Sequence, residues 1–533
     1  MPDTPRARQT FPSRQYRYKF DIDPDVQMDE PLVVAGNVYR FVLGRDPLPA
    51  AITKEESAGD PFARLVLFGG PPAPMTLRDL LARLDAVGMT EQRSFVVADG
   101  GQIKWQDAPP DLERNFRLAI VRQRPGDAQP DILVSASTDI NSPTNFLQVI
   151  GWDPDAGANQ FYERRDGVWM WAGSGWDALA PDTRGQGPFD SHVNGALNMK
   201  ELKFPWLHWH SPSAAISDEV LAPGDPLRQE PLWINRSLAD DFERTVVRPG
   251  ITRWKDSRFE RLTTGGTLTM LPDFFRQVLG TSTVNLASSS TSAAAVTGGA
   301  SVKLPATFLV DVDALLGVIG LDPAMTMPVV NAAVYSTTLQ RFDVHVKDAH
   351  HSFVGDTHFV FVVPEPAFED VQIAEKLIEI GVLSPRLAAA MLMVDFQNPV
   401  FSRRRLRLLD YVPASAAVGD PTSFESAFIG AVRAAPAAAQ ADSAEAALLA
   451  NWALPADAWR AEYEQRIASF TSALAARCAD ADAFASLFEV AESRRREFRK
   501  RKLAEFRLTT PFTNIPETAP LLEFDRAGAV RPK

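Results

Sequence analysis

The hydrophobic pattern of this chain changes near Ala367, and this change limits the folds that the sequence can adopt. Before that point, short apolar runs alternate with glycine, proline and aspartate, which is typical of strands joined by turns. From Ala367 to Phe506, apolar residues recur at helical spacing on alanine-rich faces. The sequence therefore predicts an α+β protein, mostly antiparallel β in the N-terminal and central parts, with a helical C-terminal part.

The same pattern predicts four segments along the 533 residues. Residues 1–135 read as a mixed, β-rich domain, interrupted by one amphipathic helix at Thr76–Val87 whose first residue is a suitable N-cap. Residues 136–365 read as an irregular β domain rich in tryptophan. Residues 366–508 are expected to form a helical domain, and residues 509–533 an extended tail.

Composition excludes several classes of protein. Lys plus Arg is 55 and Asp plus Glu is 67, so the net charge of −12 argues against general nucleic-acid binding. A single cysteine excludes a disulfide framework, a thiolate zinc finger and a cysteine-held iron–sulfur cluster. With no bilayer-length apolar run and no apolar leader segment in the sequence, we expect a cytoplasmic protein without membrane contacts. The oligomeric state stays open.

Most short catalytic signatures are absent from the sequence. It contains no GxxxxGK[ST] phosphate loop, no strand-borne GxGxxG and no GxSxG nucleophile elbow. The cationic run Ser493–Lys502 lies near the end of a predicted helix, where positive charge suits the helix dipole. We expect a solvent-exposed helix face there, and docking on an acidic partner or nucleic acid is the alternative.

Histidine placement is the feature that suggests a function. All seven histidines fall into two short windows, and grouped imidazoles commonly serve catalysis or metal binding. The first window contains His192, His208 and His210, and the second contains His345, His350, His351 and His358.

The first window has the geometry of a chelating pair. Phe204–His210 reads as an extended segment, so alternation places His208 and His210 on one face of a strand. His192 would approach from the preceding turn. Three imidazoles would leave coordination positions for water, dioxygen or substrate.

The second window pairs histidine with aspartate. Alternation places Asp343 with His345, and Asp356 with His358, on shared strand faces. The adjacent pair His350–His351 lies in the intervening turn, and we expect only one of the two to point inward. Asp343 and Asp356 are the candidates for orienting ligands or moving protons.

From these groups we predict a metal-dependent, oxygenase-like oxidoreductase with histidine-ligated iron or copper. The surrounding tryptophan and phenylalanine favour an apolar or aromatic small molecule as substrate. Zinc in a hydrolase and a non-covalently held haem are alternative cofactors. A different class also stays open, since hydrogen-bonded core histidines would instead suit a non-catalytic interaction protein with an aromatic-rich β recognition surface.

Overall fold

The computed structural model is an α+β protein whose chain divides into two compact units. It describes residues 36–70, 72–98, 101, 103–108, 116–165, 167–197, 209–212, 214–289, 294–347, 352–501 and 510–533. Unit 1 comprises Met1–Ser257 with Ala504–Leu508, and unit 2 comprises Arg258–Leu503 with Thr509–Lys533. The predicted fold class is confirmed, because an antiparallel-rich sheet occupies the N-terminal and central part and helices predominate in the C-terminal part.

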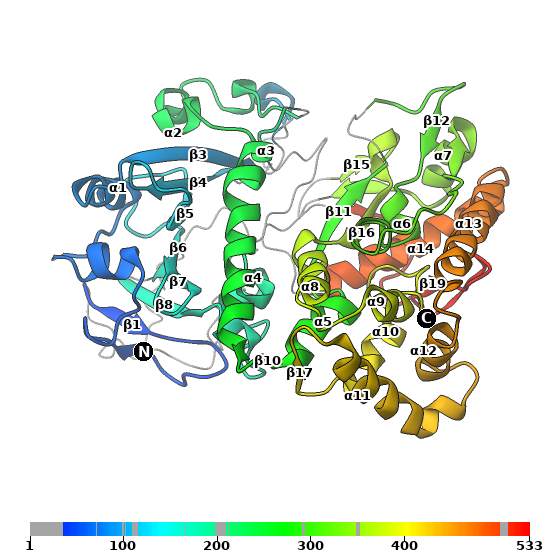
Figure 1. The fold of residues 1–533 in the computed structure, drawn as a ribbon. Coiled ribbons are helices and arrows are strands. Elements are labelled where there is room, and N and C mark those ends of the chain that lie inside the picture. The colour runs from blue at the N-terminus through cyan, green and yellow to red at the C-terminus, as the bar shows by residue number, and fades with distance from the viewer. Residues whose placement is uncertain are drawn as a thin grey trace, which may run out of the picture. The chain divides into compact units, whose positions relative to one another are not determined.

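Unit 1 is built on an eight-stranded sheet of order β2-β1-β8-β7-β6-β5-β4-β3, shown in Figure 1. Every neighbouring pair is antiparallel except β1 with β8. Residue 135, the predicted first domain boundary, lies within β5, and the four-segment division stays a prediction. The strands are β1 (Val38–Arg40), β2 (Ala50–Ala51), β3 (Glu91–Ala98), β4 (Phe116–Gln123), β5 (Ile132–Ser137), β6 (Leu147–Asp153), β7 (Ala158–Arg165) and β8 (Val168–Ser174).

One face of this sheet forms the main apolar core of unit 1. Because side chains alternate along each strand, residues such as Ile120, Val134 and Val149 share this face and are almost fully buried. The predicted helix at Thr76–Val87 packs here, and the Thr76 hydroxyl accepts the N–H of Asp79 at 3.0 Å as an N-cap. The covering elements are η3 (Phe62–Leu67), α1 (Leu77–Ala86) and α2 (Pro231–Ile234).

The opposite face carries the elements that build the candidate site. A helix begins as α3 (Ala239–Phe242), continues through the π-helical turn η10 (Glu243–Val247) and runs on as α4 (Arg248–Leu262). The ring of Phe242 packs against that of Phe95 of β3, with centroids 4.5 Å apart and planes tilted by 37°. The remaining short helices of unit 1 are η4 (Trp105–Asp107), η5 (Asp177–Leu179), η6 (Gly187–Asp190), η7 (Val193–Gly195), η8 (Asp218–Val220) and η9 (Pro226–Gln229).

Unit 2 is mainly helical and has its own large apolar core. Its helices are α5 (Leu271–Gly280), α6 (Ala306–Leu309), η11 (Val312–Val318), α7 (Ala332–Arg341), η12 (His358–Val360), α8 (Phe368–Glu379), α9 (Pro385–Leu392), α10 (Arg403–Arg407), η13 (Leu408–Tyr411), α11 (Pro421–Ala434), η14 (Pro436–Ala439), α12 (Ala444–Trp452), α13 (Trp459–Arg477) and α14 (Ala481–Lys500). Within the described residues of both units, no helix is long and apolar enough to cross a membrane.

The strands of unit 2 form small two- and three-stranded sheets. They are β9 (Thr263–Thr264), β10 (Thr267–Thr269), β11 (Val284–Ser288), β12 (Ser301–Lys303), β13 (Val329–Asn331), β14 (His345–Lys347), β15 (Ser352–Val354), β16 (Val362–Pro366), β17 (Ser415–Ala417), β18 (Pro511–Phe512), β19 (Leu522–Phe524) and β20 (Val530–Pro532). The sequence predicts a continuous strand over Val329–Lys347, but α7 occupies its middle. The Asn331 side chain caps this helix by accepting the N–H of Ala333 at 2.7 Å.

The first three arginines of the cationic run on α14 are buried, so the expected solvent-exposed face is wrong for them. Arg494, Arg495 and Arg496 are 5%, 0% and 1% exposed. Their guanidinium groups donate mainly to backbone carbonyls of other segments, among them Val362 in β16 and Ala519 in the C-terminal segment. These arginines cross-link unit 2 because each planar fork reaches several acceptors at once.

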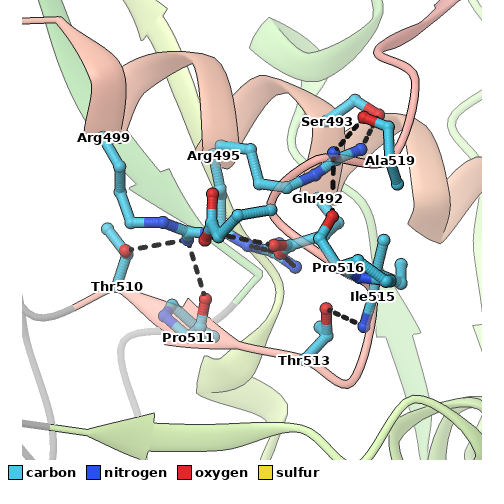
Figure 2. A network of polar contacts seen from close by, with 12 residues as sticks. Glu492, Ser493, Arg495, Arg499, Thr510, Pro511, Thr513, Ile515, Pro516 and Ala519 are labelled. Atoms are coloured by element: carbon cyan, nitrogen blue, oxygen red, sulfur yellow. Dashed lines mark hydrogen bonds and ion pairs between the residues drawn. The ribbon is translucent and has the colours of Figure 1, made fainter.

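Figure 2 shows how this network continues into the C-terminal segment. Glu492 lies between two arginines, with ion pairs to Arg495 (2.5 Å) and Arg499 (2.9 Å). Arg499 also reaches the Thr510 hydroxyl and the Pro511 carbonyl, both at 3.4 Å. The described part of the predicted tail is therefore bound to α14 by charge-assisted hydrogen bonds.

Candidate functional site

His192 is a buried histidine of unit 1 with a defined ring orientation. It is 6% exposed, and its Nδ1 lies 3.1 Å from the carbonyl oxygen of Ala196. A carbonyl only accepts, so Nδ1 carries the proton and Nε2 is the acceptor nitrogen of the neutral ring. The ring packs on Phe161 of β7 at a centroid distance of 5.2 Å.

The turn that follows this histidine is held in an uncommon backbone conformation. Asn194 has φ +61, in the left-handed region that few residues other than glycine adopt. Its carbonyl accepts the indole N–H of Trp254 at 2.7 Å, and the Gly195 carbonyl accepts Nδ2 of Asn159 at 3.0 Å. A Cβ on Gly195 would lie 2.4 Å from Cα of Gly175, so glycine is required there. Strain of this kind often accompanies a functional position.

His210 has a different role in this arrangement. Its Nδ1 accepts the backbone N–H of Ile216 at 3.0 Å, so the proton of the neutral ring is on Nε2. Burial, reinforced by nearby Arg236, lowers the pKa of His210 and favours that neutral form. With one nitrogen accepting and the other protonated, the ring fixes the turn and presents no lone pair to a metal ion.

The second histidine group lies in unit 2. The carbonyl oxygen of Asp343 lies 2.6 Å from Nδ1 of His345, and its carboxylate lies 3.3 Å from the same nitrogen. Asp343 has φ +47, so a turn and not a strand brings this pair together. His358 begins η12, and its buried Nε2 has no hydrogen-bond partner in the structure. Asp356 is exposed.

Three predicted ligands, His208, His350 and His351, lie outside the described residues. Within the described part of the chain, no group of three or more histidine, cysteine, aspartate or glutamate side chains is placed to hold a metal ion. The metal site predicted from the sequence therefore stays a prediction.

A pocket lies between the second face of the unit 1 sheet and the elements that cover it. It is a small pocket, with about 40 Å³ of space that water molecules can enter. Its lining residues are Arg117, Ala119, Leu133, Ser135, Gln148, Ile150, His192, Leu197, Trp209, Phe242 and Val247.

The floor of this pocket combines polar and apolar pairs of the sheet. Leu133 of β5 is opposite Ile150 of β6, and Ser135 is opposite Gln148. The Ser135 hydroxyl oxygen is buried and has no hydrogen-bond partner in the structure. An unsatisfied buried hydroxyl costs free energy, so its presence in a pocket wall favours a ligand that supplies the missing bond.

The π-helical turn η10 forms part of the opposite wall. Phe242 precedes the turn and Val247 ends it, and both line the pocket. π segments within α-helices are rare and are frequently found at functional sites.

Sequence reasoning identified His192 but missed the rest of this pocket. A signal was present in β5, where Leu133, Ser135 and Ser137 share one face of an otherwise apolar strand. A strand face that is half polar normally faces solvent, so the sequence gives no reason to expect a pocket there. The structure shows that a helix covers this face.

Comparison of the chain with protein-family models, curated proteins and solved structures finds no match. The geometry of the pocket is consequently the basis for a functional assignment.

Proposed function

We propose that unit 1 binds a small, mainly apolar molecule in this pocket and that His192 is the proton acceptor that acts on it. The observation that carries the proposal is the placement of an oriented, buried imidazole in the wall of a small pocket. Trp209, Phe242 and Val247 would pack on the apolar body, and the Ser135 hydroxyl would bond its polar group.

Two local features support a binding role over a purely structural one. The left-handed Asn194 is two residues from the lining residue His192, and the π turn η10 ends at the lining residue Val247. Such features are commonly retained where geometry serves binding or catalysis.

Phenol is a suitable first probe, since it combines an apolar ring with one hydroxyl. Val247→Phe fills the pocket from its wall, and Val329→Phe, at an exposed position of unit 2, is the matched control. We expect saturation-transfer NMR to detect phenol binding to the native chain and the control. Binding should weaken at least roughly tenfold in Val247→Phe and in His192→Ala, about the loss of one good contact. Equal phenol binding by all four proteins would contradict the proposal.

The metal-dependent oxidoreductase remains a second proposal. In its favour, Nδ1 of both His192 and His345 contacts a backbone carbonyl, an orientation that metal-binding histidines commonly use. Elemental analysis for iron, copper and zinc in the native chain, His192→Ala and His345→Ala would test each unit separately. Metal content that is unchanged in both variants would remove both histidines as ligands.

A further inference from the structure

A wide cleft of unit 1 lies at the edge of its sheet and shares no lining residue with the pocket that contains His192. It holds about 610 Å³ of space that water molecules can enter, a volume within the range of small-molecule sites. The residues that line it are Glu91, Gln92, Arg93, Val121, Gln123, Ala128 and Thr245. The cleft is therefore a second candidate site, and its lining is mainly polar.

The floor of this cleft is formed by β3, the last strand of the sheet, and by its neighbour β4. Glu91 of β3 is opposite Gln123 of β4, and Arg93 is opposite Val121. Because side chains alternate along a strand, Glu91 and Arg93 share one face, with their Cα atoms about 7 Å apart. Val121 is buried, so the floor next to Arg93 is apolar.

One wall of the cleft comes from the π-helical turn η10, which supplies Thr245. The Thr245 hydroxyl accepts a hydrogen bond from Nη1 of Arg93 and donates one to the Asp241 carbonyl at 2.7 Å. These bonds hold the arginine side chain against the helix. The hydroxyl is neutral, so it orients the guanidinium group without compensating its charge.

Two opposite charges thus lie side by side on this floor. Within the described part of the chain, neither Glu91 nor Arg93 forms an ion pair, and each is bonded to a neutral group. Glu91 accepts the side-chain N–H of Gln123 at 3.1 Å, and the same amide donates to the Asp127 carbonyl at 2.8 Å. A carboxylate accepts several hydrogen bonds and a guanidinium donates up to five, so both groups have capacity left for a ligand.

We propose that this cleft binds a free α-amino acid with a small apolar side chain, its ammonium group on Glu91 and its carboxylate on Arg93. In an α-amino acid the two charged groups are about 3 Å apart, and a charge-assisted hydrogen bond of about 2.8 Å extends from each. That span matches two side chains whose Cα atoms are about 7 Å apart. The buried Val121 favours an apolar ligand side chain. The site is independent of the proposed function, because His192 and its pocket take no part in it.

Three probes of nearly the same shape test the two contacts separately. L-Valine carries both charges, isobutylamine lacks the carboxylate, and isovalerate lacks the ammonium group. Titration calorimetry on the full chain should detect valine binding. Each of the other two probes should bind at least roughly tenfold more weakly, because one charge-assisted contact is lost.

Two variants assign each contact to its residue. Glu91 is exposed and Arg93 is half-buried, so Glu91→Gln and Arg93→Gln should keep the fold. Each should weaken valine binding at least about tenfold. Glu91→Gln should not weaken isovalerate, which makes no ammonium contact, and Arg93→Gln should not weaken isobutylamine. The matched controls Glu55→Gln and Arg433→Gln, at exposed positions outside the cleft, should bind all three probes as the native chain does.

Several results would overturn the amino-acid site. Valine that fails to bind the native chain, or that binds no better than both analogues, would do so. Native affinity for valine in Glu91→Gln and Arg93→Gln would have the same meaning. Loss of isovalerate in Glu91→Gln would also contradict the assignment, because it would mean that the cleft had changed shape and had not simply lost one contact.

Discussion

Asp60 is a carboxyl within the main core of unit 1, and its surroundings change its acidity. It is 0% exposed, and its Oδ1 accepts the N–H groups of Phe62 and Ala63 at 2.9 and 3.2 Å. The Tyr162 hydroxyl donates to the other oxygen. Burial raises the pKa of Asp60 to about 6, with a smaller contribution from Asp153, and these hydrogen bonds only partly offset that rise.

This pKa predicts a pH-dependent loss of stability. An unfolded aspartate ionises near pH 4, so between about pH 4 and 6 the folded chain holds a proton that the unfolded chain has released. The stability that the protonated Asp60 contributes is therefore fully present below pH 4, and it is lost as the pH rises through 6. Asp60→Asn keeps the acceptor for Phe62 and removes the titration. As the pH rises through this range, the free energy of unfolding of Asp60→Asn should increase relative to that of the native chain by up to roughly 3 kcal/mol.

Urea unfolding of both proteins at several pH values measures that difference. Hydrogen exchange of backbone amides in unit 1 reports the unfolding of this unit. Ser57→Ala, in the loop before this carboxyl, is a control that leaves the titration in place. A stability difference between Asp60→Asn and the native chain that is constant from pH 4 to 6 would contradict the assigned pKa.

At the scale of single residues, the sequence predicted which histidines deserve attention but not what each ring does. Grouping in the chain singled out His192 and His210 equally. Hydrogen-bond direction separates them, because one ring donates to a carbonyl at Nδ1 and the other accepts an N–H there. Backbone partners such as Ile216 leave no trace in a sequence pattern, so this distinction was not predictable.

At the scale of elements, the C-terminal helices were the most predictable part of the chain. Apolar residues at helical spacing over Phe368–Ile380 and Ser384–Val394 predict two helices, and the structure has α8 and α9 there, with Ser384 as the N-cap of α9. The segment of α7 contains the β-branched residues Val334, Thr337 and Thr338, which favour strands, yet it forms a helix. The burial of the α14 arginines could not be predicted, since residues distant in sequence supply the carbonyls that they bind.

Arg495 of α14 provides a test at this scale. It is 0% exposed, it pairs with Glu492 and it donates to the Val362 carbonyl at 3.0 Å. Arg495→Met should lower the free energy of unfolding by about 3 kcal/mol, because it leaves buried acceptors without a donor. Arg433→Met, at an exposed position of α11, should change it by less than about 0.5 kcal/mol.

Denaturant unfolding monitored by far-ultraviolet circular dichroism measures both values. The free energy of unfolding of Arg495→Lys should lie between those of Arg495→Met and Arg433→Met, since lysine keeps the charge but not the bidentate fork. Equal stability of Arg495→Met and Arg433→Met would mean that the buried arginine network makes no net contribution to the free energy of unfolding.

For the whole molecule, the division into two compact units, each with its own apolar core, predicts local stability. Phe524 of β19 is 0% exposed and packs on Phe308 and Phe470 with centroids 5.6 and 5.9 Å away. Phe524→Ala should destabilise unit 2 by about 3–5 kcal/mol through the cavity that it leaves. Leu80→Ala, in the core of unit 1, is the reciprocal variant and should cost about 2–5 kcal/mol there.

Hydrogen exchange followed by mass spectrometry distinguishes the units, since each peptide reports the opening free energy of its own segment. Phe524→Ala should accelerate exchange in α13 and α14 and leave β4 to β7 unchanged, and Leu80→Ala should do the reverse. This follows because each substitution removes contacts within a single core, and the C-terminal segment belongs to unit 2 by those contacts. Equal acceleration in both units by either variant would show instead that the chain opens as one cooperative body.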